Sequence, residues 1–220
     1  GVEPRDCQRA IDLPVSPAIH ADVEEKFFAL GIGVGAPIIG IGAGSVWPTK
    51  RWSAEGFAQL IVRLKQQMDC QIVLFGGAED AAVVDDVLAR CGAAAVSLVG
   101  RISLRELPAA LRRCHVFVTN DSGPMHIAVA QRVPTVAVFC ATTRELGFFP
   151  YTKHAIVVEK KLSCRPCTSH GGRRCPLGTE ACIRLIGPEA VFAAVQKLLS
   201  VERGDLPAPL DSFEPEYVTL

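Results

Sequence analysis

The sequence predicts an α/β fold built on a doubly wound parallel sheet, and three observations lead to this prediction. From residue 37 onward, near-continuous apolar runs alternate with amphipathic stretches, as in buried parallel strands joined by crossover helices. Glycine-rich or polar turns follow several of the apolar runs. The chain of 220 residues is 49% hydrophobic and 21% charged, which is enough apolar material for one sizeable core. The expected architecture is therefore Rossmann-like, and ligands of such sheets bind beyond the carboxyl ends of the strands.

Apolar runs place the predicted strands, and helical spacing places the helices between them. The strands are expected at 37–42, 71–76, 95–99, 115–119, 134–139 and 155–158. Ser53 can cap the first helix of this unit. The inward faces of its first two helices are formed by Phe57, Leu60, Ile61 and Leu64, and by Val83, Val84, Val87 and Leu88.

Three further helices complete the unit. Ser103 and Glu106 have the spacing of a capping box, which predicts a helix that turns Leu104, Leu107 and Leu111 inward. The next helix is expected over 121–131. The last begins at Gly187-Pro188, with proline in its first turn, and its buried residues are Val191, Val195 and Leu198.

Two flanks lie outside this α/β unit, which we assign to residues 37–202. Residues 1–36 are predicted to be an interdomain connector with a leading helix over 20–30, which Gly31 ends in a left-handed conformation. Residues 203–220 lack helical periodicity and are predicted to form an extended C-terminal tail.

Charge and hydropathy exclude two classes of partner. The 23 basic residues balance 23 acidic ones, so the surface as a whole has no field that gathers nucleic acid, and no nucleic-acid partner is expected. No stretch approaches the roughly 18 consecutive apolar residues of a membrane span. Residues 1–7 lack the layout of a signal peptide. We therefore expect a soluble, cytoplasmic chain.

The nine cysteines fall into two groups. Those expected to be small buried hydrophobes are Cys7, Cys70, Cys91, Cys114 and Cys140. The clustered ones are Cys164, Cys167, Cys175 and Cys182. These four could hold zinc, but the second pair lacks the tight spacing of zinc knuckles, so metal binding stays open. Basic residues outnumber acids in this segment, which suits an anionic substrate, a membrane face or simply a solvated loop.

The loop at 42–52, after the first predicted strand, suits a phosphate. Its glycines let the backbone approach a ligand, Ser45 offers a hydroxyl, and Lys50 and Arg51 place positive charge before a helix N-terminus. The spacing is neither that of a P-loop nor Gly-x-Gly-x-x-Gly. The alternative is an ordinary strand-to-helix turn with an exposed lysine and arginine.

Residues 119–126 follow the fourth predicted strand and suit a diphosphate-sugar. The amides of Ser122 and Gly123 can bind a diphosphate, while Asp121 can orient a sugar hydroxyl or a cation, with His126 one turn inside the helix. The alternative is N-capping by Asp121 or Ser122 and a buried core histidine. After the second strand, Glu79 suits ribose hydroxyls or caps a helix.

Taken in order, these segments resemble the donor domain of family-9 glycosyltransferases, especially the lipopolysaccharide heptosyltransferases. The resemblance covers about residues 12–200 and is carried by 48–52 (PTKRW), 118–126 (VTNDSGPMH) and the cysteine motif from Cys164 to Cys182. It implies the C-terminal half of a GT-B fold, with 37–202 as the nucleotide-sugar-binding domain. The family's N-terminal acceptor domain, which carries an aspartate general base, is not represented, so we expect either part of a longer protein or a module that works with a partner.

The resemblance also implies ligands and residue roles. The donor would be ADP-L-glycero-D-manno-heptose, and the acceptor the lipopolysaccharide inner core or a lipid-linked sugar. Ser45 and Lys50 would contact phosphates, Glu79 the ribose and Ile102 the adenine. The residues expected at the diphosphate-sugar are Asp121, Ser122, Gly123 and His126.

The implied reaction is an inverting displacement without an obligatory metal, and no cofactor is expected. Lys50 is the predicted catalytic residue, because negative charge grows on the departing diphosphate. The acceptor proton must be removed by a group elsewhere, so this half alone is expected to be inactive. A non-catalytic nucleotide-sugar-binding module and a GT-B-fold sugar epimerase remain alternatives. Peripheral contact with the inner face of the inner membrane also stays open.

Overall fold

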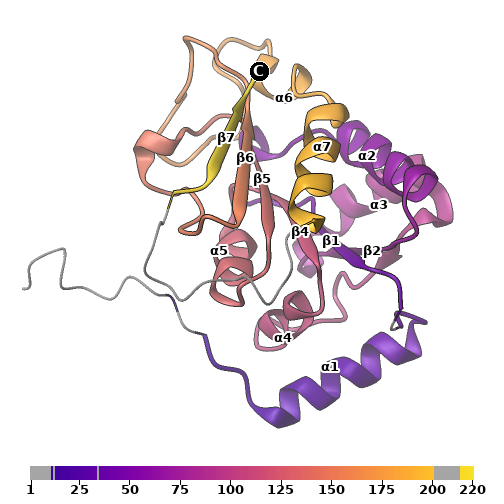
Figure 1. Ribbon diagram of the computed structural model, residues 1–220. Helices are drawn as coiled ribbons and strands as arrows, with labels where there is room; N and C mark the ends of the chain where they lie inside the picture. Colours follow the sequence, from indigo (N-terminus) through magenta and orange to yellow (C-terminus); the bar gives the residue numbers. More distant parts are fainter. Residues whose placement is uncertain (1–10, 12, 34, 201–213) are drawn as a thin grey trace, which may run out of the picture.

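The computed structural model describes residues 11, 13–33, 35–200 and 214–220. Within these ranges, seven parallel strands form one sheet in the order β3-β2-β1-β4-β5-β6-β7 (Figure 1). The strands are β1 (Ile38–Gly42), β2 (Gln71–Phe75), β3 (Val96–Ser97), β4 (Val116–Asn120), β5 (Thr135–Phe139), β6 (Ala155–Glu159) and β7 (Glu216–Thr219). The predicted doubly wound sheet is confirmed. Its strand order reverses between β1 and β4, which is where sheets of this kind bind ligands.

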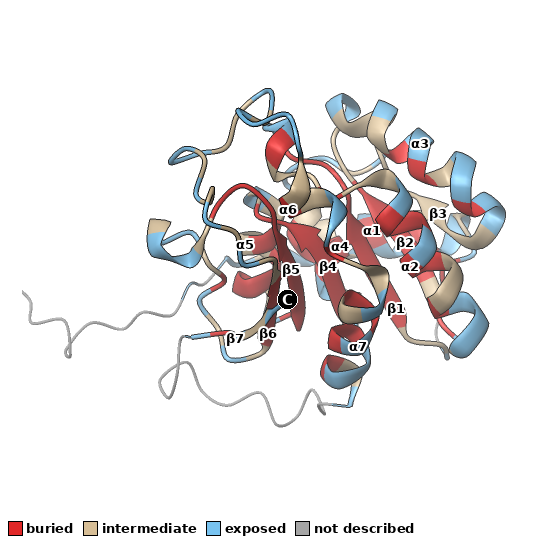
Figure 2. Ribbon diagram, turned by 90° about the horizontal axis from the view of Figure 1, so that it is seen from above, coloured by how far each residue is buried: buried red, intermediate tan, exposed pale blue. Residues whose placement is uncertain are grey.

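Helices cover both faces of the sheet, and the residues between the layers are buried (Figure 2). On one face lie α2 (Ala54–Gln67), α3 (Ala81–Cys91) and α7 (Pro188–Leu199). On the other lie α1 (Pro17–Ala29), α4 (Leu107–Arg112) and α5 (Gly123–Ala130). The short helix α6 (Ala181–Arg184) precedes α7. Every residue of β1, β4 and β5 is buried, which explains why their sequences are continuous apolar runs.

The two caps predicted from the sequence, at Ser53 and Ser103, are both present. The Ser53 hydroxyl accepts a hydrogen bond from the Gly56 amide at 3.0 Å, as an N-cap does. At the predicted capping box, the Ser103 amide donates to Glu106 Oε2 at 2.8 Å. The prediction that Leu104 faces inward is wrong, because its side chain is 75% exposed. The helix itself begins only at Leu107, so Leu104 lies in the preceding turn.

The leading helix α1 starts earlier than predicted and packs into the core. Ser16 caps it, and Gly31 follows it with a φ of +69°, as expected for a left-handed helix end. Val23 and Phe27 are buried in the same apolar cluster as α4. Residues 1–10, 12 and 34 of the predicted connector lie outside the described part of the chain.

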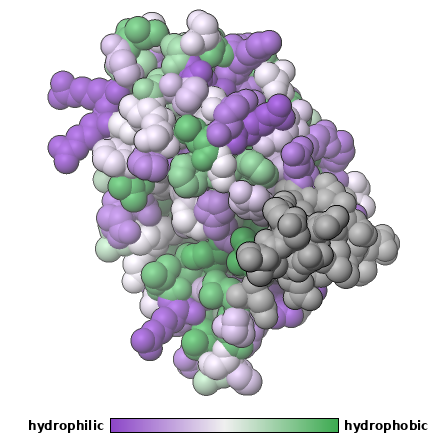
Figure 3. Space-filling model, turned by 90° about the vertical axis from the view of Figure 1, so that its left-hand side faces the viewer, coloured by the Kyte–Doolittle hydropathy of each residue, from purple (hydrophilic) through white to green (hydrophobic). Residues whose placement is uncertain are grey.

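Part of the predicted extended tail is a strand of the sheet. β7 pairs in parallel with β6, from Ile156 opposite Glu216 to Glu159 opposite Thr219. The sequence did not predict this pairing, because an edge strand with one partner needs no continuous apolar run. The side of the molecule that carries β7 exposes a mixture of hydrophilic and hydrophobic side chains (Figure 3). Residues 203–213 of the tail lie outside the described residues.

The ion pair between α1 and the turn before α4 leads to a prediction about stability and pH. Lys26 Nζ lies 2.6 Å from Glu106 Oε1, and the hydrogen bonds from Lys26 and Ser103 lower the pKa of Glu106 to about 2. A lowered carboxyl pKa contributes stability above the unfolded pKa of about 4.3, and this stability is lost as the pH falls toward 2.

Glu106→Gln is therefore expected to lower the free energy of unfolding by about 1 kcal/mol at pH 7, with a smaller effect as the pH falls below 4. Urea unfolding of both proteins between pH 7 and pH 3 measures this difference. A loss that stays constant over this range would mean that the substitution acts through packing and not through ionisation.

Candidate functional site

Two loops meet at the reversal of strand order, and Asn120 joins them. Its Nδ2 donates to the carbonyl oxygens of Ala43 at 2.8 Å and Gly44 at 3.2 Å, and its Oδ1 accepts from the Trp52 amide at 2.8 Å. The Asn120 side chain is fully buried, so all of these bonds are shielded from water. The sequence analysis did not predict that Asn120 joins the two loops. The one feature that could have indicated it is an asparagine at the end of an apolar strand.

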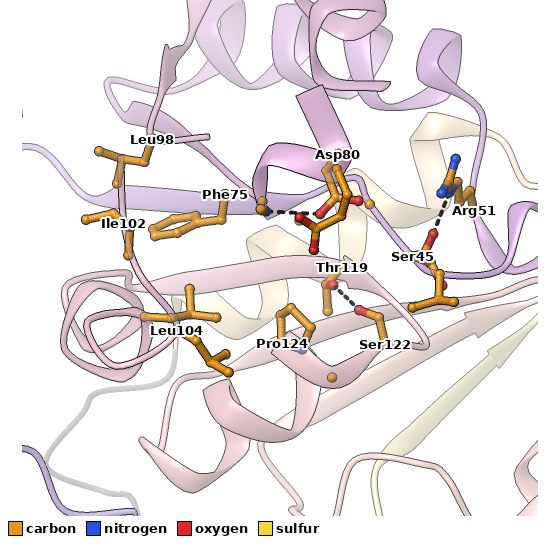
Figure 4. Close-up of a pocket in the computed structure, with 18 of the residues that line it drawn as sticks. Ser45, Arg51, Phe75, Asp80, Leu98, Ile102, Leu104, Thr119, Ser122 and Pro124 are labelled. Carbon is orange, nitrogen blue, oxygen red and sulfur yellow. Dashed lines mark hydrogen bonds between the residues drawn. The ribbon is translucent and has the colours of Figure 1, made fainter. Parts of the chain in front are cut away.

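A pocket of about 620 Å³, called here the large pocket, lies at this edge of the sheet. One end is apolar and is formed by Phe75, Leu98, Ile102, Leu104 and Leu107. The other end is formed by the loops after β1, β2 and β4, including Gly44, Ser45, Gly77, Ser122 and Gly123. Figure 4 shows Leu98, Ile102 and Leu104 on one side of the cavity and Ser45 and Ser122 on the other. Five of the predicted site residues line it: Ser45, Glu79, Ile102, Ser122 and Gly123.

The large pocket also contains Asp80, which the sequence analysis did not select, and Arg51, which it placed with Lys50 as positive charge before a helix N-terminus. Asp80 Oδ2 accepts from the Gly77 amide at 3.1 Å, and burial raises the pKa of Asp80, with this hydrogen bond opposing the rise. A Cβ at Gly44 would clash with the Asp80 carboxylate, so any larger residue there would require the Asp80 side chain to move. Arg51 donates from Nε to the Ser45 carbonyl at 2.7 Å, which closes the first loop on itself.

A second pocket of about 330 Å³, the small pocket, adjoins the first. The two share Ser45, Val46, Ser122 and Gly123 as lining residues. The residues that line only the small pocket are Trp47, Lys50, Asp121, Phe148, His126 and His170. The predicted site residues thus divide between two adjoining cavities that meet along a common rim.

Lys50 and Asp121 form a buried ion pair in the small pocket. Lys50 Nζ lies 2.7 Å from Asp121 Oδ2, and the two side chains are 12% and 3% exposed. Asp121 Oδ2 also accepts from the hydroxyl of Thr142 at 2.6 Å, and Thr142 is itself buried. Lys50 is therefore not the exposed lysine of an ordinary turn, and its charge is balanced from the opposite loop. The pairing joins residues 71 positions apart (121 − 50), so sequence spacing gave no sign of it.

The start of α5 does not have the simple cap that was the alternative for residues 119–126. Ser122 occupies the N-cap position, but among the described residues its hydroxyl lies near Thr119 Oγ1 and the Asn120 carbonyl, at 3.4 and 3.3 Å, and makes no cap bond. Asp121 is engaged by Lys50 and Thr142. The positive end of the α5 dipole, at Gly123, thus lies on the rim shared by the two pockets.

His126 lies beside the ion pair, and the charges of both Lys50 and Asp121 affect its pKa. Burial lowers the pKa of His126, and the Lys50 charge lowers it further, whereas the Asp121 charge opposes them. The imidazole is therefore neutral at pH 7, with one nitrogen able to donate a hydrogen bond and the other to accept one.

This arrangement predicts that two substitutions shift the pKa of His126 in opposite directions. Lys50→Met removes a cation and leaves Asp121 negative, so the pKa of His126 is expected to rise. Asp121→Asn removes the anion, so this pKa is expected to fall. An NMR titration of the imidazole signals, assigned with His126→Gln, measures both shifts. Lys197→Met, on α7, is the control; equal shifts in all three variants would contradict the arrangement.

The cysteines divide as the sequence predicted. Cys70, Cys91, Cys114 and Cys140 are buried thiols, which confirms that they are small buried residues, and Cys7 lies outside the described residues. Cys164, Cys167, Cys175 and Cys182 are also free thiols, and they lie on a segment, 160–182, called here the cysteine loop. Burial raises the pKa of Cys182 to about 11. In the described part of the chain, no three or more histidine, cysteine or acidic side chains are arranged to hold a metal ion.

The sequence and the fold agree with comparisons to known proteins. The model of glycosyltransferase family 9 (heptosyltransferase) matches residues 9–176. Lipooligosaccharide heptosyltransferase 2 of Campylobacter jejuni is 30% identical over 168 residues, which are 74% of this chain and 52% of that protein. The chain thus spans about half the length of the curated relatives that it matches most extensively. No helix in the described residues is long and apolar enough to cross a membrane.

Solved structures of similar proteins match the same half. The structure of E. coli ADP-heptose lipopolysaccharide heptosyltransferase II has a TM-score of 0.69 and 26% identity, over 86% of this chain and 53% of that one. A family-9 glycosyltransferase from Veillonella parvula has a TM-score of 0.74 and 30% identity, with the same coverage. The architecture is therefore that of one domain of a GT-B heptosyltransferase. By its sequence and its fold, this chain belongs to glycosyltransferase family 9, the heptosyltransferases.

Proposed function

We propose that this chain is the donor-binding domain of a lipopolysaccharide heptosyltransferase and that it binds ADP-L-glycero-D-manno-heptose across its two pockets. The adenosine lies in the large pocket, the heptose in the small pocket and the diphosphate along the shared rim. The observation that carries this proposal is the rim itself, where Ser45, Ser122 and Gly123 join an apolar cavity to one lined by charged and polar groups.

The large pocket has the chemistry that a nucleoside requires. Its apolar end offers Phe75, Ile102 and Leu104 to the faces of the adenine. Glu79 and Asp80 supply carboxylate oxygens to the ribose hydroxyls. Leu104 is 75% exposed and lines this pocket, so its side chain is accessible to a bound base.

The small pocket suits a sugar attached to a diphosphate. Neutral His126 and the Asp121 carboxylate offer hydrogen-bond partners to sugar hydroxyls. Lys50 and the α5 N-terminus supply positive charge to the phosphate oxygens. Because Asp121 holds Lys50 in place, the cation is positioned before the donor arrives.

The proposed reaction is an inverting displacement at the anomeric carbon. An acceptor hydroxyl oxygen forms the new bond to this carbon while the bond to the diphosphate oxygen breaks, and the electron pair leaves with ADP. Lys50 and the amides at Ser122 and Gly123 stabilise the negative charge that develops there. The acceptor proton passes to a base outside this chain, and the acceptor is the lipopolysaccharide core. The reaction then takes place on the cytoplasmic side of the inner membrane.

Nucleotide titrations test the binding part of this proposal. ADP at about 100 times its dissociation constant is expected to stabilise the chain by about 2.7 kcal/mol, and ADP-heptose is expected to bind more tightly than ADP. UDP is the matched control, because it has the same diphosphate but a different base. No stabilisation by ADP, or equal stabilisation by UDP, would contradict the adenosine site.

Transfer is tested separately, after the chain is joined to a family-9 N-terminal domain. ADP release that depends on a lipopolysaccharide-core acceptor is expected from the joined protein and not from this chain alone. Binding without any release by the joined protein would favour a non-catalytic nucleotide-sugar-binding module.

A further inference from the structure

The cysteine loop is anchored beneath the small pocket by Arg165. This side chain is only 3% exposed, and its guanidinium pairs with Glu159 at 3.0 Å. It also donates to the carbonyl oxygens of Phe139, Lys160 and Thr142. Thr142 is the residue whose hydroxyl binds Asp121. The base of the loop is therefore bonded directly to the backbone that orients the Lys50–Asp121 pair.

The tip of the same loop is bonded to the segment that carries Lys50. The Gly172 amide donates to Thr49 Oγ1 at 2.7 Å, and the Thr49 amide donates to the Gly172 carbonyl at 3.2 Å. Thr49 is buried, so this reciprocal pair of bonds is largely shielded from water. The residue before Lys50 is thus fixed by a segment more than 120 positions away.

Gly171 packs directly on the Lys50 side chain. Its φ is +88°, and a Cβ there would lie 2.7 Å from Lys50 Cγ and 2.9 Å from Lys50 Cδ. Any side chain at this position would have to displace the lysine stem. Glycine is therefore required here both for its backbone conformation and for this close approach.

The neighbouring residue, His170, completes the outer wall of the small pocket. Its ring lies 5.7 Å from that of Phe148, centroid to centroid, and both residues line the cavity together with Lys50 and His126. His170 is exposed, so its imidazole is free to meet a ligand in this pocket.

We propose that residues 170–172 of the cysteine loop are part of the donor-sugar site: Gly171 and Gly172 position Lys50, and the His170 imidazole contacts the sugar of the bound sugar nucleotide. This inference rests on the proposed function and deepens it. In this proposal, the cysteine loop contributes to the site mainly through backbone contacts. Residues 170–172 lie beside Lys50 at the edge of the small pocket.

Two glycines of the same loop provide a matched test of positioning. Gly171→Ala adds a methyl group against Lys50, whereas Gly178→Ala adds one at a φ of +67° with no atom within 4 Å, so the backbone strain is similar and the contact differs. Gly171→Ala is expected to weaken ADP-heptose binding by about tenfold relative to Gly178→Ala, as measured by calorimetry. Gly171→Ala is also expected to change the pKa of His126 measured by NMR, whereas Gly178→Ala is expected to leave this pKa unchanged.

Two further variants keep the proposal testable if Gly171→Ala does not fold. His170→Ala is expected to weaken ADP-heptose binding about five- to tenfold while ADP binding stays within twofold, with His20→Ala on α1 as the control. Thr49→Val removes the hydroxyl that accepts a hydrogen bond from the Gly172 amide. This variant is expected to shift the pKa of His126 in the same direction as Gly171→Ala.

The outcomes separate the two proposals. If the unmodified chain binds neither ADP nor ADP-heptose, the proposed function fails. If it binds both, and Gly171→Ala and His170→Ala match their controls in affinity and in the His126 titration, the donor site stands and the role of residues 170–172 is overturned.

Discussion

If the proposed reaction is right, Lys50→Ala is expected to lower kcat of this chain joined to a family-9 N-terminal domain by about 100- to 1,000-fold, which corresponds to about 2.7–4 kcal/mol of transition-state stabilisation. The reason is that the partner charge of Lys50 on the diphosphate develops mainly as the anomeric bond breaks, so donor binding weakens less than turnover. Lys50→Arg is expected to recover only part of the activity, because a planar guanidinium does not replace an ammonium ion held at 2.7 Å from Asp121.

Measuring kcat and KM for these variants requires a check of folding. Removing Lys50 leaves the buried Asp121 carboxylate with the Thr142 hydroxyl but without its cation, which is expected to cost about 1–3 kcal/mol of stability. Lys153→Ala, at an exposed position, is the control. If folded Lys50→Ala enzyme kept its kcat within a factor of two, the assignment of Lys50 as the catalytic residue would be wrong.

Arg165→Met is expected to destabilise the chain by about 3–5 kcal/mol, because breaking a buried ion pair leaves an uncompensated charge. Glu159 would lose its cation, and the carbonyl oxygens of Phe139 and Thr142 would lose a donor. Adding Glu159→Gln to Arg165→Met is expected to restore part of the loss, since the unpaired charge is then removed as well.

Urea unfolding of the single and double variants measures this effect. Arg173→Met is the matched control, because Arg173 lies in the same loop but is exposed. A loss for Arg165→Met no larger than that for Arg173→Met would show that the anchor does not stabilise the loop. In this chain joined to a family-9 N-terminal domain, we expect Arg165→Met to reduce the proposed transfer activity in the fraction that stays folded, since Thr142 orients Asp121.

Local signals predicted the parts of this fold that depend on neighbours along the chain. The strands β1, β2, β4, β5 and β6 were apparent because strands buried on both faces must be continuously apolar. The caps at Ser53 and Ser103 were apparent because each bonds a residue three positions away. The prediction for Leu104 was wrong because the capping box precedes a turn and the helix begins only at Leu107.

The sequence by itself determined the class of fold, the family and the two loops of the candidate site, because strand periodicity and the motifs at 48–52 and 118–126 are local patterns. Only the tertiary structure decided that Lys50 pairs with Asp121, that Asn120 joins the two loops, and that the cysteine loop reaches Thr49. Each of these contacts joins segments about 70 or more residues apart. Such contacts arise when crossover helices bring the carboxyl ends of distant strands to one edge of the sheet, and no spacing along the chain encodes them.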